Sequence, residues 1–185
     1  MSKKIVIVYF SGYGHTKRMA EAVAEGAGGS LLAVDAEGNL PEAGWEQLAA
    51  ADAIVFGAPT YMGGVPWQFK KFADASSKPW FHQVWKNKLA AGFTNSASMN
   101  GDKQVTLQYL FTLSMQHSMV WVGTGMMPSN SKAATRNDLN YVASFSGAMA
   151  STPSDASVEE MLPGDLATAR QFGARVAEVA GKFSA

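Results

Sequence analysis

Cysteine is absent from this 185-residue sequence, and histidine is scarce. Without cysteine the chain has no disulfides, no thiol nucleophile and no thiolate ligands for zinc or an iron–sulfur cluster. The three histidines, His15, His82 and His117, lack the i, i+4 spacing that is typical of a zinc site. We therefore predict no metal site, and any redox function must use a bound cofactor.

An excess of charge of one sign and long hydrophobic runs are also missing. Fifteen basic and fifteen acidic residues give a formal net charge of +0, so no global field favours nucleic acid or an anionic membrane. The apolar run from Ile5 to Phe10 is too short for a signal-peptide core or a membrane span. We expect no nucleic-acid partner, no membrane partner and a cytoplasmic location.

What is present is a repeating pattern of short apolar runs separated by segments with helical spacing. A hydrophobic content of 47% fits one domain covering residues 1–185. The alternation predicts an α/β fold in which a parallel sheet is covered by helices. Strands are expected at Ile5–Phe10, Leu31–Val34, Ala53–Ala58, Leu89–Thr94 and Met119–Val122, and helices at Thr16–Gly26, Trp45–Ala50, Trp67–Ala75, Lys103–Met115 and Asp165–Phe183.

The segment from Gly123 to Gly164 breaks this pattern. It is rich in Gly, Ser, Thr, Asn and Pro and is too long for an ordinary connection. We interpret it as a site wall, an oligomer contact or a partly mobile segment.

The first candidate site is the loop from Ser11 to Thr16 (SGYGHT), which follows the first expected strand. Ligands of open parallel sheets bind beyond the carboxyl ends of the strands. The loop offers hydroxyls and backbone N–H groups at the start of a helix, where about half a positive charge accumulates. It predicts a phosphate site; the alternative is that Ser11 or Thr16 only caps the helix. NAD is less favoured as the resident cofactor, because Lys17 stands where the dinucleotide fingerprint requires a third glycine.

Two further loops complement the first. Residues 57–64 (GAPTYMGG) follow the third expected strand and combine an aromatic and a thioether with glycines that let backbone approach a flat ligand. Residues 94–101 (TNSASMNG) follow the fourth and are suited to hydrogen-bonding the edge of a ring. Each loop alone is more often a simple turn, but the three together are much more specific.

With these three loops the sequence resembles the flavodoxin-like family, most closely the NAD(P)H:quinone oxidoreductases of the WrbA type. The resemblance implies a doubly wound, five-stranded parallel sheet in the order 2-1-3-4-5, with helices on both faces and FMN as the cofactor. It implies that the first loop holds the FMN phosphate, the second flanks the isoalloxazine ring and the third meets the polar edge of the ring. In the third loop, Ala97, Met99 and Asn100 replace part of the family's glycine run. The cofactor-binding residues carried over are Ser11, Tyr13, Gly14, His15, Thr16, Pro59, Thr60, Tyr61, Met62, Gly63, Thr94, Asn95, Ser96, Ser98, Met99 and Gly101.

The resemblance also implies a substrate side and an activity. Trp80 and His117 fall where the family places an aromatic and a histidine beside the flavin, so they are the expected catalytic residues. The implied reaction carries two electrons from NADH or NADPH through FMN to a quinone, in a homo-oligomer that is a dimer or a tetramer. The alternative is a flavodoxin-type one-electron carrier. Such carriers are strongly acidic, and the balanced charge of this chain disfavours that role.

Overall fold

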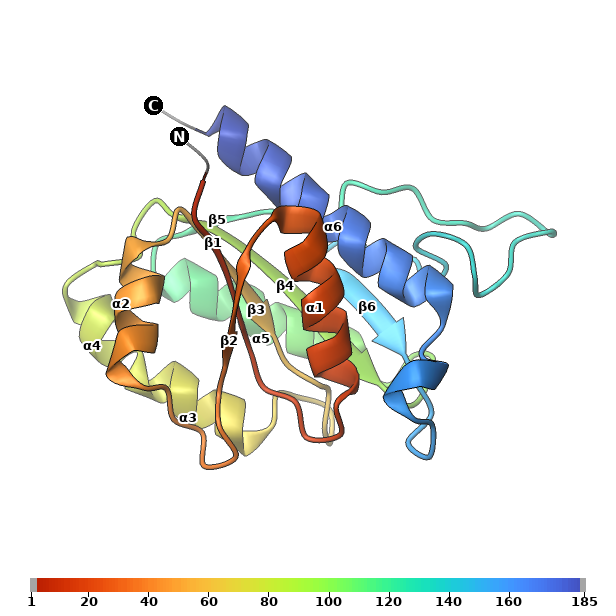
Figure 1. The fold of residues 1–185 in the computed structure, drawn as a ribbon, viewed down its shortest axis with the longest axis horizontal. Helices are drawn as coiled ribbons and strands as arrows, with labels where there is room; N and C mark the ends of the chain where they lie inside the picture. Colours follow the sequence, from red (N-terminus) through yellow and green to blue (C-terminus); the bar gives the residue numbers. More distant parts are fainter. Residues whose placement is uncertain (1–2, 184–185) are drawn as a thin grey trace.

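The computed structural model describes residues 3–183. Strands and helices alternate along the chain, as the apolar pattern predicted (Figure 1). The strands are β1 (Ile5–Tyr9), β2 (Ser30–Ala33), β3 (Ala53–Gly57), β4 (Leu89–Ser96), β5 (Val120–Trp121) and β6 (Ala148–Ser151). The helices are α1 (His15–Ala27), α2 (Glu42–Ala50), α3 (Trp67–Ala75), α4 (Ser77–Phe81), α5 (Lys103–Gln116) and α6 (Pro163–Lys182), with one 3₁₀ turn, η1 (Val158–Glu160).

The sheet is parallel and has the order β2-β1-β3-β4-β5, which confirms the predicted topology. Beside β4, two short strands take the place of the single strand that was expected. The short β5 pairs with the start of β4, and β6 pairs in parallel with the end of β4, from Phe93 to Ser96. The apolar pattern does not predict β6, because its residues, AMAS, include none of the β-branched or aromatic types that are enriched in strands.

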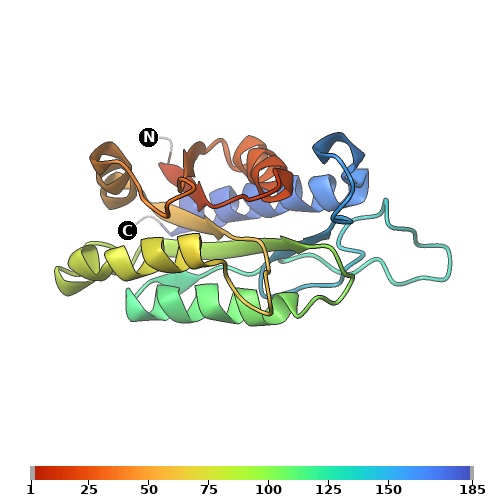
Figure 2. The same ribbon diagram turned by 90° about the horizontal axis from the view of Figure 1, so that it is seen from below.

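Two apolar cores lie on the two faces of the sheet. In β1, Ile5, Ile7 and Tyr9 belong to one core, whereas Val6 and Val8 belong to the other. Since side chains alternate across a strand, burial on both faces requires the continuous apolar runs seen in the sequence. Helices α1 and α6 cover the first face, and α2, α3 and α5 contribute to the core on the second (Figure 2).

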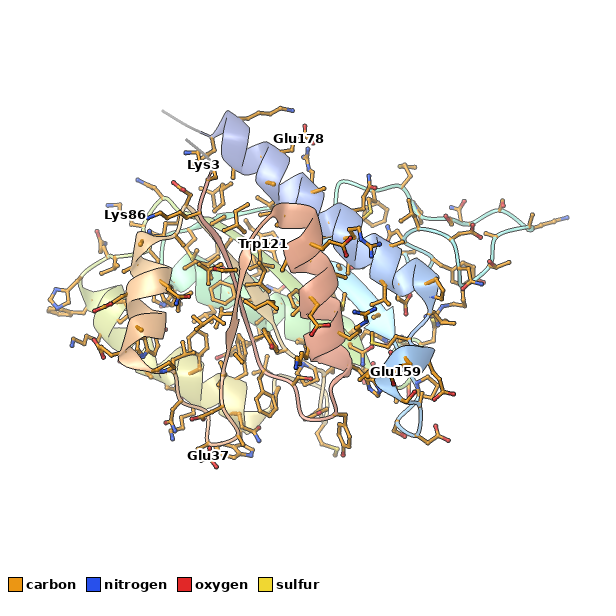
Figure 3. All side chains as sticks on the ribbon, in the orientation of Figure 1. Lys3, Glu37, Lys86, Trp121, Glu159 and Glu178 are labelled. Atoms are coloured by element: carbon orange, nitrogen blue, oxygen red, sulfur yellow. The ribbon has the colours of Figure 1, made fainter. Side chains whose placement is uncertain are left out.

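The connections of the parallel sheet lie at two opposite edges. The loops that follow β1, β3, β4 and β6 all lie beyond the carboxyl ends of the strands, whereas the connections that enter β4 and β5 lie beyond the amino ends. Figure 3 shows Lys3 and Lys86 near the amino edge, with Glu37 and Glu159 near the opposite edge. Within residues 3–183, no helix has the length and apolar character needed to cross a membrane.

Candidate functional site

A pocket of about 220 Å³ lies at the carboxyl edge of the sheet. Four loops line it, namely those that follow β1, β3, β4 and β6, so it forms where the strand order reverses. No Lys, Arg, Asp or Glu side chain is among its lining residues. The lining residues are Tyr13, His15, Thr16, Pro59, Thr60, Tyr61, Asn95, Ser96, Ala97, Thr152 and Ser154.

The loop after β1 is folded around the hydroxyl of Ser11. The Ser11 Oγ accepts hydrogen bonds from the backbone N–H groups of Gly14 and Lys17, both at 3.1 Å. Gly14 has φ = 91°, a left-handed conformation that favours glycine. Ser11 therefore shapes the loop from inside, and neither Ser11 nor Gly14 is among the lining residues.

The start of α1 presents free hydrogen-bond donors. Among the described residues, the backbone N–H groups of His15 and Thr16 have no partner, and neither has the Thr16 hydroxyl. The first turn of α1 contains no acidic side chain, and Lys17 and Arg18 follow. A helix N-terminus with free amides, a free hydroxyl and basic neighbours is a donor set suited to a phosphate.

His15 connects this helix to the segment that follows β6. Its imidazole is buried, and its Nε2 lies 2.8 Å from the carbonyl oxygen of Ala156. Because a carbonyl only accepts, Nε2 must carry the hydrogen and donate it. His15 thus lines the pocket and also fixes one of its walls.

Tyr61 connects the loop after β3 to the loop after β1. Tyr61 and Gly64 exchange backbone hydrogen bonds of 2.9 and 3.1 Å around Met62 and Gly63, which both have positive φ, as in a type I′ turn. The Tyr61 ring meets Tyr13 edge to face, with centroids 6.0 Å apart. Burial, with a smaller contribution from Tyr13, raises the pKa of Tyr61, so its phenol stays neutral. A Cβ on Gly12 would lie 2.6 Å from the Tyr61 hydroxyl, so a larger residue at position 12 would displace the Tyr61 side chain.

A chain of buried hydroxyls connects the loop after β3 with β4. The Thr60 Oγ1 lies 2.9 Å from that of Thr94 and donates to that of Thr106 at 2.8 Å. The Thr60 N–H also donates to the Asn95 carbonyl at 2.9 Å. Thr94 is fully buried and does not line the pocket, so its side chain positions the loop from behind.

The loop after β4 reaches the pocket only through its first part. Asn95, Ser96 and Ala97 line the pocket, whereas Ser98, Met99 and Gly101 do not. Gly101 has φ = 55°, and a Cβ there would lie 2.2 Å from the Ser96 Oγ. The predicted contacts of residues 98–101 are therefore not assembled within this pocket.

Thr152 and Ser154 line the pocket but were not predicted. Thr152 donates from its Oγ1 to the Asn95 Oδ1 at 3.0 Å, which joins the loops after β4 and β6. The sequence carries a weak signal for them, since a run of small polar residues follows Ala150. That signal indicates a site only when Ala148–Ser151 is known to be a strand of the same sheet.

Trp80 and His117 lie elsewhere in the chain. They border a separate surface pocket with Phe81, Gln83 and Met115, among others. His117 is 4% exposed, its Nε2 lies 2.9 Å from the Ser76 Oγ, and its ring packs on Trp85 with centroids 4.1 Å apart. This corner precedes β4, whose eight residues span more than about 20 Å. The structure therefore does not bring these two predicted catalytic residues to the pocket.

Taken together, the pocket fits a phosphorylated planar ligand such as FMN. The free donors of α1 suit its phosphate. Met62 and Gly63 are not among the lining residues, but their turn leaves open space beside Tyr61, which does line the pocket. No cluster of three or more His, Asp or Glu side chains able to hold a metal ion is found within residues 3–183.

Comparisons with known proteins agree with this geometry. The profile of the NADPH-dependent FMN reductase family matches residues 35–133. A protein of Pseudomonas aeruginosa (strain UCBPP-PA14) named flavodoxin FldP is 54% identical over 182 residues, which cover 98% of this chain and 99% of that protein. A protein of Geotalea uraniireducens (strain Rf4) named NAD(P)H dehydrogenase (quinone) is 34% identical over 207 residues, with 98% and 99% covered.

A solved structure extends the agreement to three dimensions. The crystal structure of the flavodoxin, WrbA-like protein from Agrobacterium tumefaciens is 56% identical, with a TM-score of 0.81, and the match covers 99% of this chain and 100% of that one. The family match and the whole-length relatives support the same fold and the same cofactor. The chain therefore belongs to the NADPH-dependent FMN reductase family of flavodoxin-like proteins, and FMN is its cofactor.

Proposed function

We propose that the chain is an FMN-dependent NAD(P)H:quinone oxidoreductase. When bound, FMN would take a hydride from NADH or NADPH and later pass two electrons to a quinone, so the two substrates would use one site in turn. The protein's own task is then to hold the cofactor, to leave one face accessible and to receive two planar substrates.

The observation that carries this proposal is the open, apolar and uncharged rim of the pocket. Tyr13 is 72% exposed beside Tyr61, and Met62 is fully exposed at the tip of its turn. An aromatic face adds about 0.5–1.5 kcal/mol of stacking beyond area burial, and a methionine adapts to differently shaped rings. Such a rim suits a nicotinamide and a quinone in succession.

We propose that residues of the loops around the pocket contact the cofactor. The amides of His15 and Thr16 and the Thr16 hydroxyl hold the phosphate, while Tyr61 and Met62 flank the ring. Asn95 and Ser96 supply polar groups at the ring's edge. All six residues come from loops that hydrogen bonds fasten to one another, so the site is largely formed before the cofactor arrives.

A substrate role for Trp80 and His117 requires a second copy of the chain. Both residues lie at the amino edge of their own sheet, away from the pocket. In a homodimer or homotetramer, the half-exposed Trp80 of one subunit would form the outer wall of another subunit's site. His117 is buried and already bonded to Ser76, so its substrate role has less support than that of Trp80.

A second candidate function is a flavodoxin-type one-electron carrier. The relative named flavodoxin FldP, at 54% identity, supports it. Carriers of this kind dock on partner proteins through charge complementarity, and the formal net charge of +0 gives this chain no overall field for such steering. We therefore place the enzyme first.

Anaerobic stopped-flow spectroscopy separates the two functions. For the enzyme, NADH or NADPH bleaches the flavin absorbance within the catalytic time scale, and benzoquinone then restores it. If neither NADH nor NADPH reduces the flavin but a reduced protein partner does, the chain is a one-electron carrier instead. A protein that cannot be loaded with FMN would contradict both.

A further inference from the structure

Lys103 is a buried lysine that does not line the cofactor pocket. It is the first residue of α5, and it is only 1% exposed. Its Nζ donates to three successive carbonyl oxygens of the loop after β4, namely those of Ser98, Met99 and Asn100, at 2.6, 2.9 and 3.4 Å. One cation thus holds the part of the loop that does not line the pocket.

This clamp decides where the loop's own donors point. In a trans peptide the N–H is directed away from the C=O, so carbonyls that turn inward to Lys103 leave the following N–H groups on the outer side. Those N–H groups belong to Met99, Asn100 and Gly101, and none has a hydrogen-bond partner among the described residues. Residues 97–100 are exposed, so the loop presents three free donors to whatever lies against it.

The clamp lies in a locally positive cluster, although the whole chain is neutral. Arg136 donates from Nη2 to the Asp165 Oδ2 at 2.6 Å and from Nη1 to the Met99 Sδ at 3.4 Å. The same Asp165 oxygen accepts the Ser151 N–H at 2.8 Å. Asp165 also acts on Lys103 electrostatically, without a direct contact. Two cations thus have one neighbouring carboxylate, and together they favour an anionic ligand at the loop.

We infer that Lys103 is a positioning residue that holds the loop at residues 96–101 in the conformation that receives the polar edge of FMN, and that its charge favours the reduced cofactor. The inference rests on the proposed contact between this loop and the ring. Reduced flavin gains negative charge at this edge, and a nearby fixed cation is one of the means by which a protein adjusts flavin electronics. Lys103 itself touches neither cofactor nor substrate.

Because Lys103 titrates, the affinity for FMN should depend on pH. Burial lowers its pKa to about 8; Asp165 acts against this shift, and Arg136 adds to it. Lys103 is therefore charged at pH 7 and neutral at pH 9. Since only the charged form donates to all three carbonyls, FMN affinity should fall across this interval.

Lys88 provides a matched control on the other edge of the sheet. It also clamps backbone carbonyls, with its Nζ 2.7 Å from the Ala49 oxygen and 2.5 Å from the Ala51 oxygen, and burial also lowers its pKa. It lies next to the first residue of β4, whereas Lys103 lies beyond the last. Lys88 is partly buried and Lys103 is fully buried, so the loss of a lysine clamp can be compared at both ends of one strand.

The experiment uses the full chain, stripped of FMN and titrated with it at pH 7 and pH 9. At pH 7, Lys103→Met should raise the Kd of oxidised FMN about 10-fold and that of reduced FMN about 100-fold. The tenfold difference between them lowers the two-electron potential by about 30 mV. Hydrogen exchange of the amides of residues 97–101 in the FMN-free protein should accelerate. Lys88→Met should leave both Kd values within about twofold of wild type.

Several outcomes would overturn the inference. Equal Kd values for Lys103→Met and Lys88→Met, or an unchanged potential, would show that Lys103 is only structural. If Lys103→Met does not fold, the wild-type pH profile decides, and an FMN affinity that is flat from pH 7 to pH 9 refutes the inference. In each case normal FMN reduction by NAD(P)H would leave the proposed function intact. A wild-type protein that binds no FMN would refute both.

Discussion

The carboxyl and amino ends of the parallel sheet contain the same kinds of residue but use them differently. Each end has a buried histidine, His15 or His117, and a lysine that binds backbone carbonyls, Lys103 or Lys88. Within residues 3–183, several backbone N–H groups and the Thr16 hydroxyl at the carboxyl end have no partner. At the amino end, the Nδ1 of His117, which is an acceptor, is a buried side-chain atom without a partner among these residues. Unused donors, more than residue types, distinguish a binding edge from a structural one.

The unpaired nitrogen of His117 follows from the direction of its hydrogen bonds. The Ser76 hydroxyl donates to the Ala73 carbonyl at 2.6 Å, so its oxygen must accept from the His117 Nε2 at 2.9 Å. The hydrogen is then on Nε2, and Nδ1 is a buried acceptor without a partner. His117 is thereby held neutral, and burial lowers its pKa to about 4.

The largest effect that tests this comparison is the stability of the protein in acid. Between about pH 6.5 and pH 4, the unfolded chain binds a proton at His117 and the folded chain does not, so the free energy of unfolding falls as the pH falls. The shift corresponds to about 3 kcal/mol. Urea unfolding at pH 7 and pH 4 should show that loss in the wild type and much less of it in His117→Gln. Equal losses in both proteins would mean that His117 is not the group responsible.

The second effect is on cofactor affinity. Thr16→Val removes a hydroxyl that has no partner within residues 3–183 but would face the phosphate, so the Kd of FMN should rise about 10- to 100-fold. Titration monitored by flavin fluorescence measures this change, and the melting temperature of the FMN-free protein should not move.

Ser76→Ala is the control at the amino end. It should destabilise the protein by about 1–3 kcal/mol, because His117 loses its acceptor, without changing the Kd of FMN. The reverse pattern would contradict the assignment of the two ends.

The smallest effect is expected from Trp80→Ala. Trp80 is 46% exposed and lies at the amino edge, so the Kd of FMN should stay within about twofold of wild type. Steady-state kinetics with a quinone tests its proposed role in a neighbouring subunit's site, where kcat/KM should fall about 10-fold. Unchanged kinetics would remove Trp80 from the substrate pocket. A large loss of FMN affinity would show that the amino edge reaches the cofactor.

Much of the fold could be predicted because the signals were local and redundant. The apolar runs around β1 and β3 and the helical spacing of α3 located those elements to within about a residue. β6 could not be found in this way, and with it the roles of Thr152 and Ser154 were missed. Its strand character comes from its pairing with β4, which no local pattern records.

The sequence could predict which loops meet at the pocket, but not which of their side chains enter it. The loop after β1 lies at the pocket as expected, but Thr94 points into the protein and bonds Thr60. His117 precedes a strand of the parallel sheet, and this placement alone assigns it to the amino edge. Lys103 was overlooked because carbonyls, which every residue has, are its partners.

The divided last strand has a consequence for how chains of this fold can differ in length. β4 is paired with Trp121 at Ala90 and with Ala148 at Phe93, so only Ala91 and Gly92 separate the point where the chain departs from the point where it returns. Because its ends lie so close together, the connection between β5 and β6 behaves as an insertion. Related chains can lengthen or shorten it without changing the strand pairing of the sheet. The segment between β5 and β6 is nevertheless held in place, because Arg136 in its middle contacts Asp165 and Met99. Variation in its length is therefore tolerated by the fold but constrained by the loop that follows β4.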